Sequence, residues 1–415
     1  MGATMIEKLI RRNTGSETAC AGDIVTVSVD RVMIHDIFIP FVAEKFREMG
    51  FTRVWDPDKI VLIYDHLVPA SQLDDSRHHR IGDAFAAEQG LTHVHRSDGI
   101  CHQLMTEAGY VRPGDVVFGT DSHTTTYGCV GAFSSGIGYT EMASILGTGT
   151  LWVRIPETIR VVVDGHLPPH VTSKDVILRL IGDLGADGAS YCALEFAGSC
   201  VEELSVASRM TMANMAVEAG AKCALFVPDE KTAAYCRMEL GEAERSLAAD
   251  ADAHYIRTVH YRAEDLVPVL ACPSQVDKIR PVSELEGLPI DQVFLGSCTN
   301  GRLEDLMCAA EILKGGHVAP FVKLIVTPAS RQVYLDALAN GTMEILQRAG
   351  AIITHPGCGL CCGRTGGILT DGERVVATNN RNFLGRMGTS KVEIYLASPA
   401  TAAASALAGK ITQAR

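Results

Sequence analysis

Three cysteines in glycine-rich segments have the spacing of a metal or iron–sulfur site. Cys358 and Cys361 lie in the segment PGCGLCCG, as a Cys-x-x-Cys pair among glycines. The glycines and the leading Pro-Gly predict a tight turn that directs both thiolates at one point. Cys298 occurs earlier, in LGSCTNG, directly after an apolar run and among similarly small residues. The three cysteines therefore predict a metal centre supported by the last third of the chain.

Three kinds of site fit this cysteine pattern. A zinc ion would require a fourth protein ligand, and His355 is the only nearby candidate. A Cys-x-x-Cys redox pair, with Cys298 as a bystander, would be expected early in a small βαβ domain. An iron–sulfur cluster held by three cysteines leaves one iron open, which suits Lewis-acid chemistry on a substrate oxygen. Cys362 is geometrically awkward as a fourth ligand because it adjoins Cys361. The spacing favours the open cluster by a small margin and leaves the other two readings open.

Two carboxylate–histidine pairs follow apolar runs in the first third of the chain. Asp65 and His66 follow the run KIVLIY, and Asp121 and His123 follow GDVVFG. Such runs are typical of buried parallel strands, and functional groups in open α/β sheets collect just beyond the carboxyl ends of strands. A carboxylate beside an imidazole raises its basicity or fixes its tautomer. These four residues are therefore candidates for acid–base chemistry.

Two further histidines and two arginines extend the set. His35 and His102 also follow apolar segments. A single histidine of this kind is more often structural, but four at segment ends within one third of the chain favour a functional site. Arg381 and Arg386 lie in the segment NNRNFLGR. One interpretation is a solvated basic loop. The other is a clamp for substrate carboxylates, because guanidinium groups pair bidentately with planar anions. Arginines beside a Lewis acid suggest a di- or tricarboxylate substrate.

Composition and charge restrict the class of protein. The chain has 415 residues, 47% of them hydrophobic and 21% charged, as expected for a soluble enzyme of two or three domains. No apolar run reaches the roughly 20 residues that span a bilayer, and the N-terminus has no signal-peptide pattern. A net charge of −12 argues against nucleic acid or an anionic membrane as a partner. Thirteen cysteines without an export signal predict a cytoplasmic location.

Alternating strand and helix patterns run through the whole sequence and predict an α/β protein with largely parallel sheets. Changes of texture near Pro156 and before Pro281 divide the chain into residues 1–156, 157–280 and 281–415. Ser173 is expected to cap the helix that follows it. The expected strands are 23–30, 59–64, 114–119, 158–164, 292–295 and 322–326, and the expected helices are 76–89, 99–108, 173–181 and 205–221.

Six motifs in order give the chain a close resemblance to the aconitase superfamily: GICHQ, GTDSHT, EFAG, GSCTNGRLEDL, PGCGLCCG and NRNFLGR. Within that superfamily the chain is similar to the stand-alone large subunits of 3-isopropylmalate dehydratase, homoaconitase and 2,3-dimethylmalate dehydratase. The resemblance covers nearly the whole chain. It implies three α/β/α-type domains packed around an iron–sulfur cluster, with boundaries that agree with those read above.

The resemblance also implies roles for individual residues. One [4Fe–4S] cluster per subunit, with one open iron for substrate and water, would be held by Cys298, Cys358 and Cys361. Asp65 and His66 match the pair that protonates the departing hydroxyl. The groups that organise water at the open iron match His102, Asp121, His123 and, from EFAG, Glu195. The substrate-binding positions match His35, Asn380, Arg381 and Arg386.

A partner subunit follows from the same resemblance. The sequence stops where aconitase continues into its fourth, swivelling domain, which carries the serine that removes the carbon-bound proton. We therefore expect a hydro-lyase that acts on a hydroxy dicarboxylate and is active only with a separate small subunit. The expected activity is that of 3-isopropylmalate dehydratase in leucine biosynthesis, with homoaconitase or 2,3-dimethylmalate dehydratase as alternatives. A non-catalytic iron–sulfur regulator and a zinc-dependent hydrolase that uses His66 and His123 are the readings from other classes.

Overall fold

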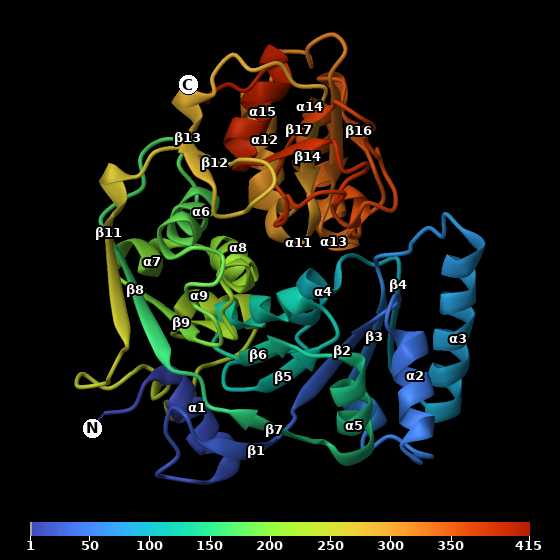
Figure 1. The fold of residues 1–415 in the computed structure, drawn as a ribbon, viewed down its shortest axis with the longest axis vertical. Helices are drawn as coiled ribbons and strands as arrows, with labels where there is room; N and C mark the ends of the chain where they lie inside the picture. The colour runs from blue at the N-terminus through green and yellow to red at the C-terminus, as the bar shows by residue number, and fades with distance from the viewer. Residues whose placement is uncertain (1) are drawn as a thin grey trace. The chain divides into compact units, whose positions relative to one another are not determined.

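The computed structural model describes residues 2–415, which divide into two compact units (Figure 1). The first unit comprises the chain up to Arg96 together with Leu104–Asp164 and Ala189–Tyr261. The second comprises Ser97–Gln103, Gly165–Gly188 and Arg262–Arg415. Both are layered α/β structures built largely on parallel strands, so the predicted fold class is confirmed. The domain boundaries proposed at 156 and 280 remain a prediction.

A five-stranded parallel sheet forms the centre of the first unit, in the order β4-β3-β2-β5-β6. All residues of β3 and β5 are buried, because these apolar runs have neighbours on both faces. Helix α2 packs against α3 and α5, which Figure 1 shows beside the sheet. The bounds are β2 (Arg31–His35), α2 (Ile39–Glu48), β3 (Ile60–Tyr64), α3 (Leu73–Gln89), β4 (His93–Arg96), α4 (Cys101–Glu107), β5 (Val116–Gly119), η2 (Ser122–Val130), β6 (Phe133–Gly136) and α5 (Tyr139–Thr148).

Two smaller sheets complete the first unit. The expected strand at 23–30 forms as β1 (Ile24–Ser28), but it pairs antiparallel with β7 (Thr150–Arg154), outside the parallel sheet. A four-stranded sheet has the order β10-β9-β8-β11. The remaining elements are α1 (Met5–Thr14), β8 (Thr158–Asp164), β9 (Ala193–Ala197), α7 (Ser199–Glu203), α8 (Val206–Met215), η3 (Ala216–Ala219), β10 (Cys223–Phe226), α9 (Glu230–Cys236), α10 (Glu242–Arg245) and β11 (Arg257–Arg262).

A seven-stranded sheet forms the second unit, in the order β13-β12-β18-β17-β14-β15-β16. The strands from β18 to β16 are parallel, and β12 is antiparallel to both of its neighbours. Helices α12 and α15 pack against each other, and α15 also contacts β14 (Figure 1). The bounds are α6 (Ser173–Leu184), β12 (Val269–Ala271), β13 (Ile279–Pro281), β14 (Gln292–Gly296), α11 (Ser297–Asn300), α12 (Leu303–Leu313), β15 (Lys323–Thr327), α13 (Arg331–Ala339), α14 (Thr342–Arg348), β16 (Ile352–Ile353), η6 (Gly359–Cys362), β17 (Arg374–Ala377), β18 (Glu393–Leu396) and α15 (Pro399–Ala408).

The sequence reading of two helices differs in detail from the structure. The cap of α6 is Thr172, whose hydroxyl accepts a hydrogen bond from the backbone of Lys174, so the expectation of Ser173 as the cap was wrong by one residue. The helix expected over 205–221 ends as an α-helix at Met215 and continues as η3. Within residues 2–415, no helix is long and apolar enough to cross a membrane.

Candidate functional site

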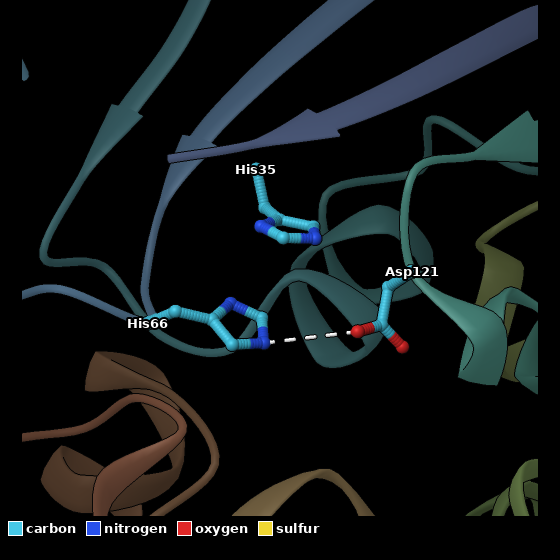
Figure 2. Close-up of side chains that lie close together, drawn as sticks. All are labelled: His35, His66 and Asp121. Carbon is cyan, nitrogen blue, oxygen red and sulfur yellow. Dashed lines mark ion pairs between the residues drawn. The ribbon is translucent and has the colours of Figure 1, made fainter. Parts of the chain in front are cut away.

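Three adjacent parallel strands bring the predicted acid–base residues together in the first unit. Strand β2 lies between β3 and β5, so the carboxyl ends of all three meet at one edge of the sheet. His35 is the last residue of β2, Asp65 and His66 follow β3, and Asp121 follows β5. Figure 2 shows the side chains of His35, His66 and Asp121 gathered at this edge. The sequence argument from strand ends therefore predicted a real cluster.

The imidazole of His66 is held between carboxylates. Its Nδ1 lies 2.7 Å from Oδ1 of Asp65, and its Nε2 lies 3.7 Å from Oδ2 of Asp121 (Figure 2). The ring stacks on that of His35, with centroids 4.4 Å apart. All four side chains lie at the end of rigid parallel strands, which fixes their mutual geometry.

The two stacked histidines have opposite electrostatic environments. Burial lowers the pKa of His35 to about 4, and the charge on His66 adds to this effect. Burial also acts to lower the pKa of His66, but the hydrogen-bonded carboxylate of Asp65, with the charges of Asp121 and Asp36, raises it well above 6.5. At neutral pH the pair therefore consists of an imidazolium at His66 and a neutral imidazole at His35. Nε2 of His35 is buried and has no hydrogen-bond partner among the described residues, so it is available to a ligand.

Asp36 is a buried carboxylate of this cluster that the sequence reasoning missed. Its Oδ1 accepts a hydrogen bond from the backbone N–H of His66 at 3.2 Å, and its Oδ2 accepts one from Leu67 at 2.8 Å. Nε2 of His79 also lies 3.6 Å from Oδ2. Asp36 thus fixes the turn that positions His66. Its position next to His35 in the sequence was the available signal.

A second carboxylate–histidine chain is completed by Glu218, which the sequence reasoning also missed. Nδ1 of His123 lies 3.2 Å from Oδ1 of Asp121, and its Nε2 lies 2.8 Å from Oε1 of Glu218. Glu218 reaches this position from η3, where the helix after Ser205 tightens.

The carboxylate of Glu195, which the resemblance places among the groups that organise water, makes contacts other than with His123 in the described structure. It accepts hydrogen bonds from the backbone N–H of Met5 at 3.1 Å and from the hydroxyl of Tyr255 at 2.7 Å. These contacts anchor the first turn of α1, so the geometry favours Glu218 as the partner of His123. The role of Glu195 remains a prediction.

The three cysteines lie in the second unit and are buried: Cys298 in α11 after β14, and Cys358 and Cys361 at and within η6, after β16. Nδ2 of Asn380 lies 3.5 Å from Sγ of Cys298, and Sγ of Cys361 lies 3.6 Å from Oδ1 of the same amide. Hydrogen bonds with the thiols of Cys361 and Cys362, and then burial, raise the pKa of Cys358 well above its usual value. The thiols at the Cys-x-x-Cys turn are therefore close neighbours, and Asn380 links that turn to Cys298.

The turn that presents Cys298 requires glycine. Gly296 ends β14 with φ of 153°, and a Cβ there would lie 2.4 Å from the backbone oxygen of Thr327. Only glycine permits this close approach of neighbouring strand ends. The guanidinium group of Arg302 stabilises this turn: it donates hydrogen bonds to the backbone oxygens of Cys298 at 2.5 Å and Thr299 at 2.7 Å.

The other predicted residues of the second unit surround these loops. His102 is buried on α4, and its neighbour Gln103 accepts a hydrogen bond from Nε of Arg302 at 3.2 Å. Nη2 of Arg386 lies 3.6 Å from Sγ of Cys361. Arg386 is half-buried, and its Nε has no hydrogen-bond partner within the part of the chain that the structure describes. The partly buried Arg381 precedes it in the same loop.

His355 is poorly placed to complete a zinc site with the cysteines. Its side chain is exposed, and its Nε2 lies 3.0 Å from the backbone oxygen of Ser97. The zinc reading of the cysteine turn therefore loses the fourth ligand on which it depended.

Comparisons with known proteins agree with these features. The model of the aconitase family (aconitate hydratase) matches residues 7–286 and 278–409. The large subunit 1 of 3-isopropylmalate dehydratase from Methanopyrus kandleri is 51% identical, over 100% of this chain and 99% of its own. A probable methanogen homoaconitase large subunit from Methanothermobacter thermautotrophicus is 45% identical, over 98% of this chain and 96% of its own.

A solved structure shares the fold at much lower sequence similarity. Aconitase X from Thermococcus kodakaraensis superposes with a TM-score of 0.52 at 14% identity, covering 91% of this chain and 89% of that one. The family model and the full-length relatives confirm the resemblance found in the six sequence motifs, and the chain belongs to the aconitase family.

Proposed function

We propose that this chain is the iron–sulfur-bearing large subunit of a hydro-lyase that dehydrates and rehydrates a hydroxy dicarboxylate. The observation that carries the proposal is the environment of His66, whose proton is retained by Asp65, Asp121 and Asp36. A buried imidazolium of this kind is suited to protonate a departing hydroxyl group, which is otherwise a poor leaving group.

The cysteine loops fit the iron–sulfur cluster that the aconitase family implies. The three thiols are buried and free of disulfides; those of Cys298 and Cys361 contact Asn380, and Arg386 provides a positive charge beside Cys361. Cys298, Cys358 and Cys361 would hold a [4Fe–4S] cluster with one open iron. Bound there, the cluster would supply Lewis-acid polarisation of the substrate's hydroxyl and carboxylate oxygens.

The remaining residues would bind substrate and transfer protons. Arg381 and Arg386 would pair with substrate carboxylates, and the unpartnered Nε of Arg386 is one donor for this purpose. His123 would orient water, with its tautomer set by Asp121 and Glu218. His102 is proposed for the same water-organising group, and the neutral His35 would donate or accept a hydrogen bond with substrate through Nε2.

The relatives are named large subunits, which supports a separate small subunit as partner, and we propose that this partner supplies the base that removes the carbon-bound proton. We propose 3-isopropylmalate as the substrate, because most of the similar full-length relatives carry that name. Homoaconitase and 2,3-dimethylmalate dehydratase activities are the alternatives. The test is to measure kcat/KM of the complex with the small subunit for the hydroxy acid of each of these three activities; the acid with the highest value is the substrate.

The test is anaerobic reconstitution with iron and sulfide, followed by assay with and without the small subunit. We expect a brown protein with the visible absorbance of a [4Fe–4S] cluster and hydratase activity only in the complex. A colourless protein after reconstitution would refute the cluster. Full activity of this chain alone would refute the need for a partner.

One observation favours a second candidate function, that of a zinc-dependent hydrolase. One ligand atom each from His35, His66 and Asp121 lies within 4.8 Å of the others, close enough to bind a single ion. This reading predicts stoichiometric zinc without acid-labile sulfide in protein purified anaerobically. The hydro-lyase proposal predicts iron and sulfide instead.

A further inference from the structure

Lys174 is a fully buried lysine in the second unit that connects the two loops bearing Cys298 and Asn380. It lies in the first turn of α6, and none of its surface is exposed to solvent. Its Nζ donates hydrogen bonds to the backbone oxygens of Thr378 at 2.6 Å and Asn379 at 2.7 Å. A third contact, at 3.3 Å, joins Nζ to Oδ1 of Asn300.

The partners of Lys174 follow the ends of two paired strands. Asn300 is the last residue of α11, which follows β14 and contains Cys298. Thr378 and Asn379 follow β17, which pairs with β14 in parallel, and they directly precede Asn380. The ammonium group of Lys174 therefore joins the segment after β14, which contains Cys298, to the segment after β17, which contains Asn380. The Asn380 amide in turn contacts the thiols of Cys298 and Cys361.

The energetics of this lysine require a nearby negative charge. Its hydrogen-bond partners among residues 2–415 are three neutral oxygens, which do not by themselves offset the cost of burying an ammonium group. A cation in the first turn of a helix is also disfavoured by the helix dipole. Burial lowers the pKa of Lys174 to about 7, against the opposing charges of Asp305, then of the Cys298 and Cys361 thiolates, and then of Asp175. A cluster bound by thiolates would add negative charge on this side of the lysine and favour its ammonium form further.

We propose that Lys174 is a positioning residue for the iron–sulfur cluster: it fixes the Cys298 and Asn380 loops in one geometry and offsets the negative charge of the thiolate-bound cluster. This inference rests on the cluster assigned under the proposed function. The Nζ contacts of Lys174 are with Asn300, Thr378 and Asn379, so its effect would be exerted through the loops that carry the ligands and through its charge.

The experiment compares Lys174→Met and Lys174→Gln with the unchanged protein and with a control, Lys222→Met. Lys222 is a half-buried lysine of the first unit that lies over the ring of Tyr191 and has a pKa lowered by burial. The control removes the same charge from the first unit, which contains none of the three cysteines. Each reconstituted protein is analysed for iron and sulfide content, for the rate of cluster loss in chelator, and for the midpoint potential by spectroscopically monitored titration.

We expect both Lys174 variants to lose the cluster at least tenfold faster than the unchanged protein and to show a more negative midpoint potential, while Lys222→Met changes neither. Unchanged loss rate and potential in the Lys174 variants would overturn the proposal, even if the apo-protein were less stable to denaturant. If Lys174→Met does not fold, the potential of the polar Lys174→Gln variant decides in the same way. Failure of the unchanged protein to take up a cluster would instead overturn the proposed function.

Discussion

Replacing Glu218 by Gln tests which carboxylate works with His123. The Glu218–His123 contact is 2.8 Å long, and both side chains are mostly buried, with 10% and 4% of their surfaces exposed. A charge-assisted hydrogen bond in such a setting contributes about 1.5–3 kcal/mol. If that contribution is made in the transition state, its loss lowers kcat by roughly 10- to 100-fold. The Gln side chain keeps the volume of the site, so the fold is expected to persist.

Glu195→Gln is the matched control, because it removes the same charge from a carboxylate with other contacts. Its partners are the backbone N–H of Met5 and the hydroxyl of Tyr255. One of these donors then faces an amide N–H, which costs about 1–3 kcal/mol of stability. We expect a lower denaturation midpoint and an unchanged kcat.

The assay is hydration of the unsaturated diacid intermediate by the reconstituted complex, followed by the loss of its ultraviolet absorbance. Cluster content is measured in each variant so that kcat is expressed per cluster. A loss of kcat in Glu195→Gln, with little change in Glu218→Gln, would show that Glu195 acts in the reaction and that the contact between Glu218 and His123 does not contribute to catalysis.

Three further outcomes follow from the site. Activity that depends on the proton of His66 should persist through neutral pH and fall only as pH rises through the raised pKa of His66. The variant His66→Asn should lose this alkaline fall in the pH–rate profile. A fall near pH 6.5 in the unchanged protein would contradict the assignment. His35 has a pKa of about 4 in the folded protein and about 6.5 in the unfolded chain, so the unfolded chain binds more protons between these values. The free energy of unfolding present above pH 6.5 is therefore partly lost as the pH falls from 6.5 towards 4. His35→Gln should remove about 2–3 kcal/mol of this loss at pH 4.5, as measured by denaturant unfolding of the apo-protein. Cys298→Ser should lower iron and sulfide content after reconstitution, whereas Cys223→Ser, at a buried cysteine of the first unit, should retain both.

The sequence by itself determined the sheet framework and the residues at its edge. The apolar runs of β3 and β5 can be stable only as strands buried on both faces, so their ends and the side chains that follow were readable from the pattern. The cysteine turn could be predicted for a different reason: the glycines that flank Cys358 and Cys361 permit the positive φ angles of a tight turn that brings the thiols together. The six motifs together identified the family.

Only the tertiary structure decided which distant groups serve those residues. Glu218, Asp36 and Lys174 lie in segments whose local pattern is ordinary, and their roles come from hydrogen bonds formed after strands and helices pack. Lys174 meets its acceptors across about two hundred residues of chain, a separation over which periodicity carries no information. Glu195 is the reverse case: its motif is recognisable in the sequence, but in the folded chain its carboxylate accepts hydrogen bonds from the first residue of α1 and from Tyr255. Local preferences set strands and turns, whereas partner choice depends on three-dimensional proximity and on the cost of leaving a buried charge unpaired.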